Sequence, residues 1–182
     1  SEDERQIIDG LFLITDKPVI YCANISDEDL GKDENKYVKL VKQYAEKDNS
    51  KCVTICAKFE EELIGLSNEE EDMFKHELGV TETGLEKLIK IGYETLGLIS
   101  YLTAGVKEVR AWTIVKGTRA PQAAGKIHTD FERGFIKAEI VTYEDLVKYN
   151  SYTLAKENGK VNIVGKDYVV KDGDVVLFKF NV

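Results

Sequence analysis

The sequence predicts an α/β part followed by an α+β part. Two short apolar runs, residues 19–23 and 51–57, lie on either side of an amphipathic helical segment, an order that favours parallel strands joined by a crossover helix. After Gly97 the apolar pattern changes to short segments of period two, which indicate a second sheet. Because the chain has only two prolines and no Ser/Gly-rich tract, the boundary is expected at a helix end.

The first part begins with residues 2–13, which are typical of the end of a helix. Pro18 favours an extended approach to the run 19–23, which is apolar on both faces and therefore predicts a buried parallel strand. Residues 35–48 predict a helix, and a turn at 48–50 leads into the second strand, 51–57. The helix carries its apolar side chains on one stripe: Tyr37, Val38, Leu40, Val41 and Tyr44.

Two capping boxes predict the starts of two further helices. In each box a hydroxyl residue precedes a glutamate by three positions, Ser67 before Glu70 and Thr83 before Glu86. The second of these helices is expected to end near Gly97.

The second part is expected to form a small mixed sheet with one or two helices packed on it. Thr142 begins one of these helices by the same capping logic. The expected strands are 98–103, 109–115, 135–141, 161–164, 168–170 and 175–182.

Composition limits the class of protein. No run of about 18 uncharged apolar residues occurs, and the first residues have no basic and apolar leader pattern, so nothing suggests a membrane or secretion and the cytoplasm is expected. The chain opens without Met on a charged, helix-prone stretch, as a sequence that has lost an N-terminal part would. Cys22, Cys52 and Cys56 each lie in an apolar stretch and are expected to be reduced and buried, with no metal site.

Charge divides the two parts. Residues 1–96 hold 12 Lys/Arg against 23 Asp/Glu, and residues 97–182 hold 13 against 10, within a chain of net charge −8. The second part could therefore face phosphates. Six basic residues are the candidate contacts for RNA or the ribosome: Arg110, Lys116, Arg119, Lys126, His128 and Arg133. The alternative is a solvated face over a normally packed Trp112 and Phe131, with His128 as a hydrogen-bonded structural residue.

A ligand of an open parallel sheet binds beyond the carboxyl ends of the strands. There the sequence places Asn24-Ile25-Ser26-Asp27 after the first strand and Cys56-Ala57-Lys58 after the second. An amide, a hydroxyl and a carboxylate can together read the edge of a purine, and backbone amides near Ala57 can meet a base carbonyl. The alternatives are an Asx or Ser turn for the first segment, and a core cysteine and a solvated lysine in the second.

Four segments of the chain resemble the YchF family of Obg-like ATPases, namely residues 104–114, 116–125, 127–136 and 165–182. The resemblance covers essentially the whole chain, more loosely before Leu85. It implies the C-terminal part of a P-loop G domain over 1–96, with the end of an inserted helical hairpin at 2–13, and a β-grasp TGS domain over 97–182. It also implies a role in translation or stress regulation and contact with the ribosome.

Through this resemblance the seven loop residues fall on the base-binding loops of the family. Ile25 replaces the lysine of ordinary GTPases, which implies a preference for ATP, whereas Asp27 replaces the family's usual glutamate with the residue of ordinary GTPases. Both ATP and GTP therefore stay open, each with Mg²⁺ in the full-length parent.

The chain contains no Gly-x-x-x-x-Gly-Lys-Ser/Thr motif. Without that loop no lysine or Mg²⁺-binding hydroxyl cradles a phosphate, so we expect no catalytic residue, no tight nucleotide binding and no hydrolysis by this chain alone. The competing class is a protein-interaction module that docks on a partner or on its own G domain, with the strand 175–182 as a pairing edge. An incomplete sheet could also self-associate.

Overall fold

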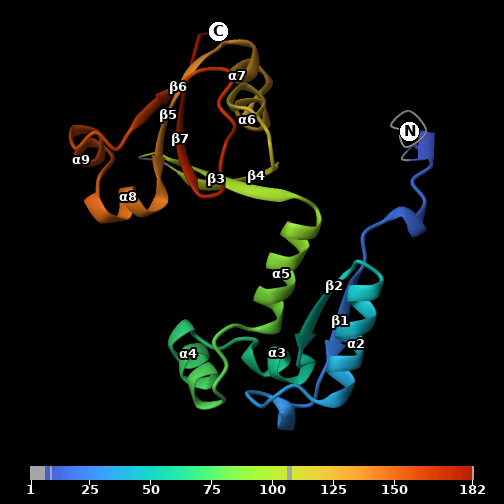
Figure 1. Cartoon of the computed structure of the whole chain (residues 1–182). Coiled ribbons are helices and arrows are strands. Elements are labelled where there is room, and N and C mark those ends of the chain that lie inside the picture. The colour runs from blue at the N-terminus through green and yellow to red at the C-terminus, as the bar shows by residue number, and fades with distance from the viewer. Residues whose placement is uncertain (1–6, 9, 106–107, 182) are drawn as a thin grey trace. The chain divides into compact units, whose positions relative to one another are not determined.

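The computed structural model describes residues 7–8, 10–105 and 108–181. The chain forms two compact units, Ser1–Leu96 and Gly97–Val182 (Figure 1). The first unit ends in helix α5 (Gly84–Thr95), after which Gly97 takes a φ of 61°, the left-handed conformation that commonly follows a helix. The prediction of an α/β part followed by an α+β part is confirmed.

The first unit contains a two-stranded parallel sheet. Strands β1 (Ile20–Asn24) and β2 (Lys51–Ile55) pair in register from Ile20 opposite Lys51 to Asn24 opposite Ile55. Helix α2 (Lys36–Lys47) connects them and contacts both strands. Two short 3₁₀ helices, η1 (Ile14–Asp16) and η2 (Asp27–Asp29), flank β1. Much of the helix expected over 2–13 lies outside the described residues, and residues 10–12 form a turn.

Helix α2 begins where the sequence predicts, because the Asn35 side chain accepts hydrogen bonds from the backbone N–H groups of residues 37 and 38. Its apolar stripe is only partly used. Val38 and Ala45 are buried, whereas Tyr37, Leu40 and Tyr44 are each about 60% exposed or more (66%, 59% and 61%). A sheet of two strands is too narrow to cover the whole stripe.

The strand β1 is also less buried than expected. Cys22 is exposed, so the expectation that every cysteine is buried is wrong for this residue, whereas Cys52 is partly buried and Cys56 is buried. The reason is position: β1 pairs with β2 on one side and has no second neighbouring strand among the described residues.

Both predicted capping boxes are present. Ser67 caps α4 (Asn68–Glu77), and Thr83 caps α5, and in each case the backbone N–H of the capping residue donates the reciprocal hydrogen bond to the glutamate carboxylate. The sequence did not predict α3 (Ala57–Leu63), because β2 ends two residues earlier than expected and the helix starts at once.

The second unit is a five-stranded mixed sheet of order β4-β3-β7-β5-β6. The hairpin β3 (Leu98–Ala104) and β4 (Val109–Val115) is antiparallel, and β5 (Phe135–Thr142) is antiparallel to both β6 (Asn162–Val164) and β7 (Asp174–Phe180). Strands β3 and β7 are parallel. Since β7 lies between β3 and β5, the expectation that it offers a pairing edge is wrong.

Four helices accompany this sheet: α6 (Ala120–Ile127), α7 (Thr129–Arg133), α8 (Tyr143–Tyr149) and α9 (Tyr152–Glu157). Of these, only α8 was predicted, from its Thr142 cap. The strand expected over 168–170 is wrong, because this segment makes a single isolated bridge, Val169 with Arg119.

The main core lies between α6 and the sheet. Tyr101 of β3 and three alanines of α6, at 120, 123 and 124, are completely buried. Small side chains let the helix backbone come close to the strands, and the Tyr101 hydroxyl donates a hydrogen bond to the carbonyl oxygen of Ala123 at 2.8 Å. This contact fixes α6, and with it the face that α6 shares with β4.

Candidate functional site

The two predicted base loops lie side by side. Since β1 and β2 are parallel and in register, Asn24 and Ile55 end their strands opposite each other. The backbone N–H of Ile25 donates to the carbonyl oxygen of Ile55 at 2.8 Å, and that of Ala57 donates to Asn24 Oδ1 at 3.0 Å. The Asn24 side chain therefore ties the loop after β1 to the start of α3.

A second contact joins the same loops. The Lys58 ammonium contacts the Asp27 carboxylate, with the two side chains 61% and 45% exposed. The hydrogen bond from Lys58 lowers the pKa of Asp27, and the same hydrogen bond raises the pKa of Lys58. Both groups are thus charged at neutral pH, and a base that uses Asp27 as an acceptor has to share it with Lys58.

The remaining loop residues lie at helix starts or are partly or fully buried. Ile25 is half-buried, Ser26 is the N-cap residue of η2, and Cys56 is buried at the N-cap of α3. The amide of Ala57, expected to meet a base, is already bonded to Asn24. The structure brings together all seven predicted residues, and the exposed polar side chains among them are those of Asn24, Ser26, Asp27 and Lys58.

Sequence reasoning missed Glu60. Its carboxylate accepts hydrogen bonds from the backbone N–H groups of Gly84 at 2.6 Å and Leu85 at 3.4 Å, so it holds the first turn of α5 against α3. The residue pairs are 24 and 25 positions apart, and no local pattern signals such a contact.

The second candidate site is a groove between β4 and α6 with a volume of about 670 Å³. The guanidinium of Arg110 lies over the Trp112 ring, 4.2 Å from its centroid, and the Trp112 indole N–H donates to Thr103 Oγ1 at 3.0 Å. Gln122 and Lys126 of α6 line the other side. Cation, aromatic face and amide therefore share one groove.

The other four candidate contacts do not line this groove. Arg119 pairs with Asp167 at 3.1 Å, and Lys116 lies in the turn after β4. His128 accepts a hydrogen bond at Nδ1 from the backbone N–H of residue 130, which caps α7, and this cap agrees with the structural role weighed for it. Arg133 ends α7 and is exposed.

No helix of the described chain has the length and apolarity that crossing a membrane requires. In the same residues, no cluster of three or more His, Cys, Asp or Glu side chains is arranged to hold a metal ion.

Known proteins resemble this chain along its whole length. A family model named YchF-GTPase_C, described as "Protein of unknown function (DUF933)", matches residues 98–181. The chain is 49% identical to a ribosome-binding ATPase YchF of Bacillus subtilis and 50% identical to one of Escherichia coli O157:H7, and each match covers 100% of this chain. The chain belongs to the YchF family.

Solved structures agree with this membership. The Schizosaccharomyces pombe YchF GTPase is 41% identical and superimposes with a TM-score of 0.85 over 98% of this chain. A GTP binding protein from Pyrococcus horikoshii shares the fold, at 20% identity and a TM-score of 0.62 over 91% of the chain. The chain spans about half the length of its YchF relatives, 50% of each curated relative and 48% of the S. pombe chain.

Proposed function

We propose that this chain supplies the base-binding part of a nucleotide site in a YchF-type, Obg-like P-loop ATPase that acts in translation or stress regulation in the cytoplasm. The observation that carries the proposal is the meeting of Asn24, Asp27 and Lys58 beyond the carboxyl ends of two parallel strands. The curated relatives are named ribosome-binding ATPases, which supports the same class.

The chemistry of the loops suits a purine base. The Asn24 amide N–H₂ is a donor, and the Asp27 carboxylate accepts from ring N–H or amino groups. Ile25 offers an apolar surface in place of a lysine. This set accommodates ATP and GTP, and the carboxylate of Asp27 adds an acceptor that a guanine N–H can use.

The phosphates and Mg²⁺ would be held by residues outside this chain, because its sequence contains no phosphate-binding Gly-rich loop. In this proposal residues 1–96 are the C-terminal part of a G domain and residues 97–182 are a TGS domain. The chain by itself then has no NTPase turnover and binds ATP or GTP only weakly.

The test is a titration with fluorescent ATP and GTP analogues, of this chain and of a full-length YchF protein that contains it. Binding by the longer protein and little by the chain is expected, and Asp27→Asn in the longer protein should weaken GTP more than ATP. Tight binding by this chain alone would contradict a divided site. An unchanged ATP/GTP ratio in Asp27→Asn would remove Asp27 from base recognition.

We further propose that the second unit contacts ribosomal or other RNA through its basic face. The groove beside Trp112 is its centre, because an unpaired base can stack on the Arg110 guanidinium that covers the indole while Lys126 meets a phosphate. Replacing Arg110, Lys116 and Arg119 together by alanine should weaken binding to ribosomes and flatten its salt dependence.

A matched control removes three exposed lysines from α2, at positions 36, 39 and 47, and so changes the net charge equally. If both triple variants lose the same affinity, the contact is general electrostatics and not this face. If neither loses affinity, the RNA proposal is wrong.

Protein docking is the second candidate function of this unit. The edge strand β4 exposes Val109 and Val115, 73% and 59% exposed, and an apolar edge of this kind pairs with a partner or docks on the G domain. Such binding would show a shallow salt dependence. The outer edge of β1 could likewise mediate self-association of the first unit, which sedimentation at increasing concentration would detect.

A further inference from the structure

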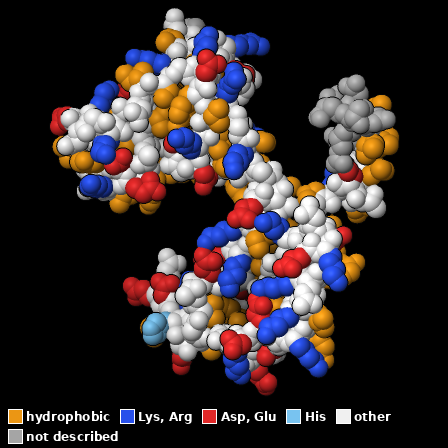
Figure 2. Space-filling model, viewed as in Figure 1, with side chains coloured by type: hydrophobic (Ala, Val, Ile, Leu, Met, Phe, Trp, Pro, Cys, Tyr) orange, Lys and Arg blue, Asp and Glu red, His pale blue; other side chains and the backbone are white. Residues whose placement is uncertain are grey.

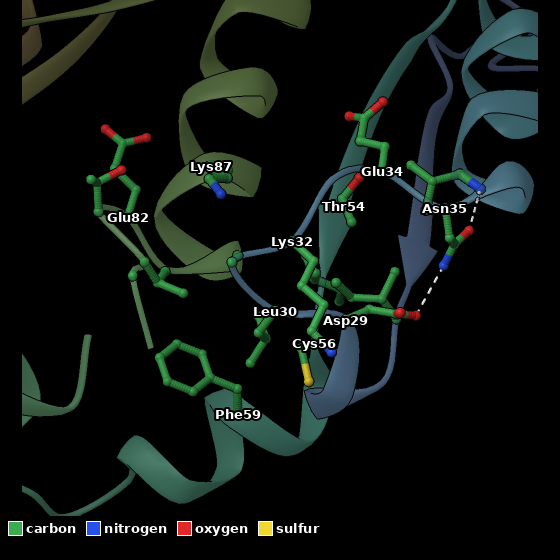
Figure 3. A pocket seen from close by; sticks show the side chains of 18 of the residues that line it. Asp29, Leu30, Lys32, Glu34, Asn35, Thr54, Cys56, Phe59, Glu82 and Lys87 are labelled. Atoms are coloured by element: carbon green, nitrogen blue, oxygen red, sulfur yellow. Dashed lines mark hydrogen bonds between the residues drawn. The ribbon is translucent and has the colours of Figure 1, made fainter. Parts of the chain in front are cut away.

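A cavity of about 320 Å³ lies beside the base loops in the first unit (Figure 3). Its walls are the loop 29–35 that follows β1, the end of β2, the start of α3 and the loop 79–84 before α5. Gly31 closes one side: its φ is +67°, and an added Cβ would lie 2.4 Å from the Leu78 carbonyl oxygen. Two loops in such close contact form a preformed wall, and the volume is at the lower end of the range for small-molecule sites.

The interior of this cavity combines an apolar surface with one unsatisfied hydroxyl. Val38, Cys56 and Phe59 line it and are each less than 5% exposed. The Thr54 hydroxyl oxygen is buried and has no hydrogen-bond partner among the described residues. Since a buried polar atom without a partner is costly, Thr54 offers a hydrogen bond that an occupant of the cavity can use.

The charged groups that line the cavity disfavour an anionic occupant. Two lysines, Lys32 and Lys87, face five carboxylates: Asp29, Asp33, Glu34, Glu60 and Glu82. The charges of Glu34 and Glu82 are balanced by ion pairs with lysines 42 and 90, which lie outside the lining.

Backbone N–H groups at the starts of α2 and α5 are also hydrogen-bonded. The first-turn N–H groups of α2 bond to Asn35, and those of α5 bond to Glu60 and Thr83. A phosphate or carboxylate would therefore meet carboxylates rather than unoccupied helix N–H groups. Asp29, whose Oδ2 accepts from Asn35 Nδ2 at 3.0 Å, keeps a second carboxylate oxygen for a ligand.

We propose that this cavity is a binding site for a small organic cation, an amine or guanidinium on a compact apolar body. The apolar body packs on Phe59 and Val38, the charged group lies at Asp29, and Thr54 provides a hydrogen bond. The cation is organic because the described carboxylates include no cluster of three suited to a metal ion.

A ligand in this cavity would also contact residues of the base loops. Ile25 and Cys56 line the cavity and also belong to these loops, and the Ile25 N–H bonds to the carbonyl oxygen of Ile55, another lining residue. That consequence rests on the proposed nucleotide function, whereas binding of the cation does not.

The experiment is an amide NMR titration of this chain with three probes of one shape: phenethylamine, 2-phenylethanol and phenylacetate. Saturable shifts centred on Thr54, Phe59 and Lys87 are expected with the amine, at least about threefold weaker binding with the alcohol, and none with the acid. Equal binding of phenylacetate, or no saturable shift with any probe, would overturn the proposal.

Two variants locate the charge. Asp29→Asn keeps an oxygen for Asn35 but removes the negative charge, so phenethylamine should bind about tenfold more weakly. Glu28→Gln removes an exposed carboxylate that does not line the cavity and should leave binding unchanged. Equal effects of the two variants would mean unspecific attraction to an acidic unit and would contradict a site at Asp29.

The same spectra separate this proposal from the nucleotide proposal. Shifts at Ala57 and Lys58 on addition of the amine report contact with the base loops, whatever nucleotide those loops bind. Cavity shifts without nucleotide binding by a longer YchF protein would leave this site standing and remove the proposed function, and the reverse result would remove only this site.

Discussion

Replacing Tyr101 by phenylalanine tests the contact that fixes α6 on the sheet of the second unit. The Tyr101 side chain is completely buried, its ring packs edge-on against Phe178 with centroids 5.8 Å apart, and its hydroxyl donates to the Ala123 carbonyl oxygen at 2.8 Å. Tyr101→Phe keeps the ring and removes only the hydrogen bond.

The expected cost is about 1 kcal/mol in the free energy of unfolding, the net value of one buried hydrogen bond. The cost is not larger, because the Ala123 carbonyl lies within α6 and also has the backbone partner of a helix. With a denaturant slope of about 1–3 kcal/mol per molar urea, the midpoint should fall by about 0.3–1 M.

The assay is urea unfolding followed by tryptophan fluorescence. Trp112 is the single tryptophan of the chain and packs against the same core, so its signal reports on the second unit. Tyr143→Phe, at a side chain 53% exposed, is the control and should leave the midpoint unchanged. A midpoint of Tyr101→Phe at or above that of the parent chain would refute the reasoning.

Three further predictions concern other contacts. Figure 2 shows that Lys, Arg, Asp and Glu side chains are spread over the visible surface of both units. Glu139 is buried, and a hydrogen bond from the Tyr152 hydroxyl is the main cause that lowers its pKa. The ionised Glu139 therefore stabilises the fold above its unfolded pKa, and this stabilisation is lost as the pH falls through its folded pKa. The urea midpoint of Glu139→Gln should depend less on pH between 6 and 3 than that of the parent chain, and an equal pH dependence would contradict this role of Glu139. Gly31→Ala should lower the melting temperature of the first unit by several degrees, because a Cβ at this position would overlap a backbone carbonyl. Gly65→Ala is the control and should lower it less, because Gly65 has a φ of +89° but open space around it. Equal losses in the two variants would mean that only backbone strain matters. Lys58→Met should raise the pKa of Asp27 towards its ordinary value in a carboxyl NMR titration, and a constant pKa would mean that the two side chains do not meet in solution.

Much of the secondary structure could be predicted because its signals are local. The capping boxes at Ser67 and Thr83 place a hydroxyl and a carboxylate three positions apart, and the N–H groups that they satisfy belong to the same turn. The strands that were predicted correctly show period two or a continuous apolar run. Helix α6 escaped prediction because its buried residues are alanines, which carry little hydrophobic signal and are selected by the close approach of Tyr101.

Which apolar side chains are buried depended on neighbouring strands, and no local sequence pattern describes these. The stripe of α2 and the cysteine at 22 have the composition of core residues, but a narrow sheet leaves Tyr37, Leu40 and Cys22 exposed. The same holds for β7. Its apolar sequence would suit an edge strand that pairs with a partner, but the order of the whole sheet places it between β3 and β5.

The sequence by itself determined the family, most of the strands, the helix starts at Asn35, Ser67 and Thr83, and the position of the two loops that follow β1 and β2, because these depend on residue type and spacing. Only the tertiary structure decided that Lys58 meets Asp27, that Asn24 bonds to the Ala57 amide, and that a cavity lies behind both loops. The physical reason is distance along the chain: each of these contacts joins residues more than 30 positions apart, and only the parallel pairing of β1 with β2 brings them together.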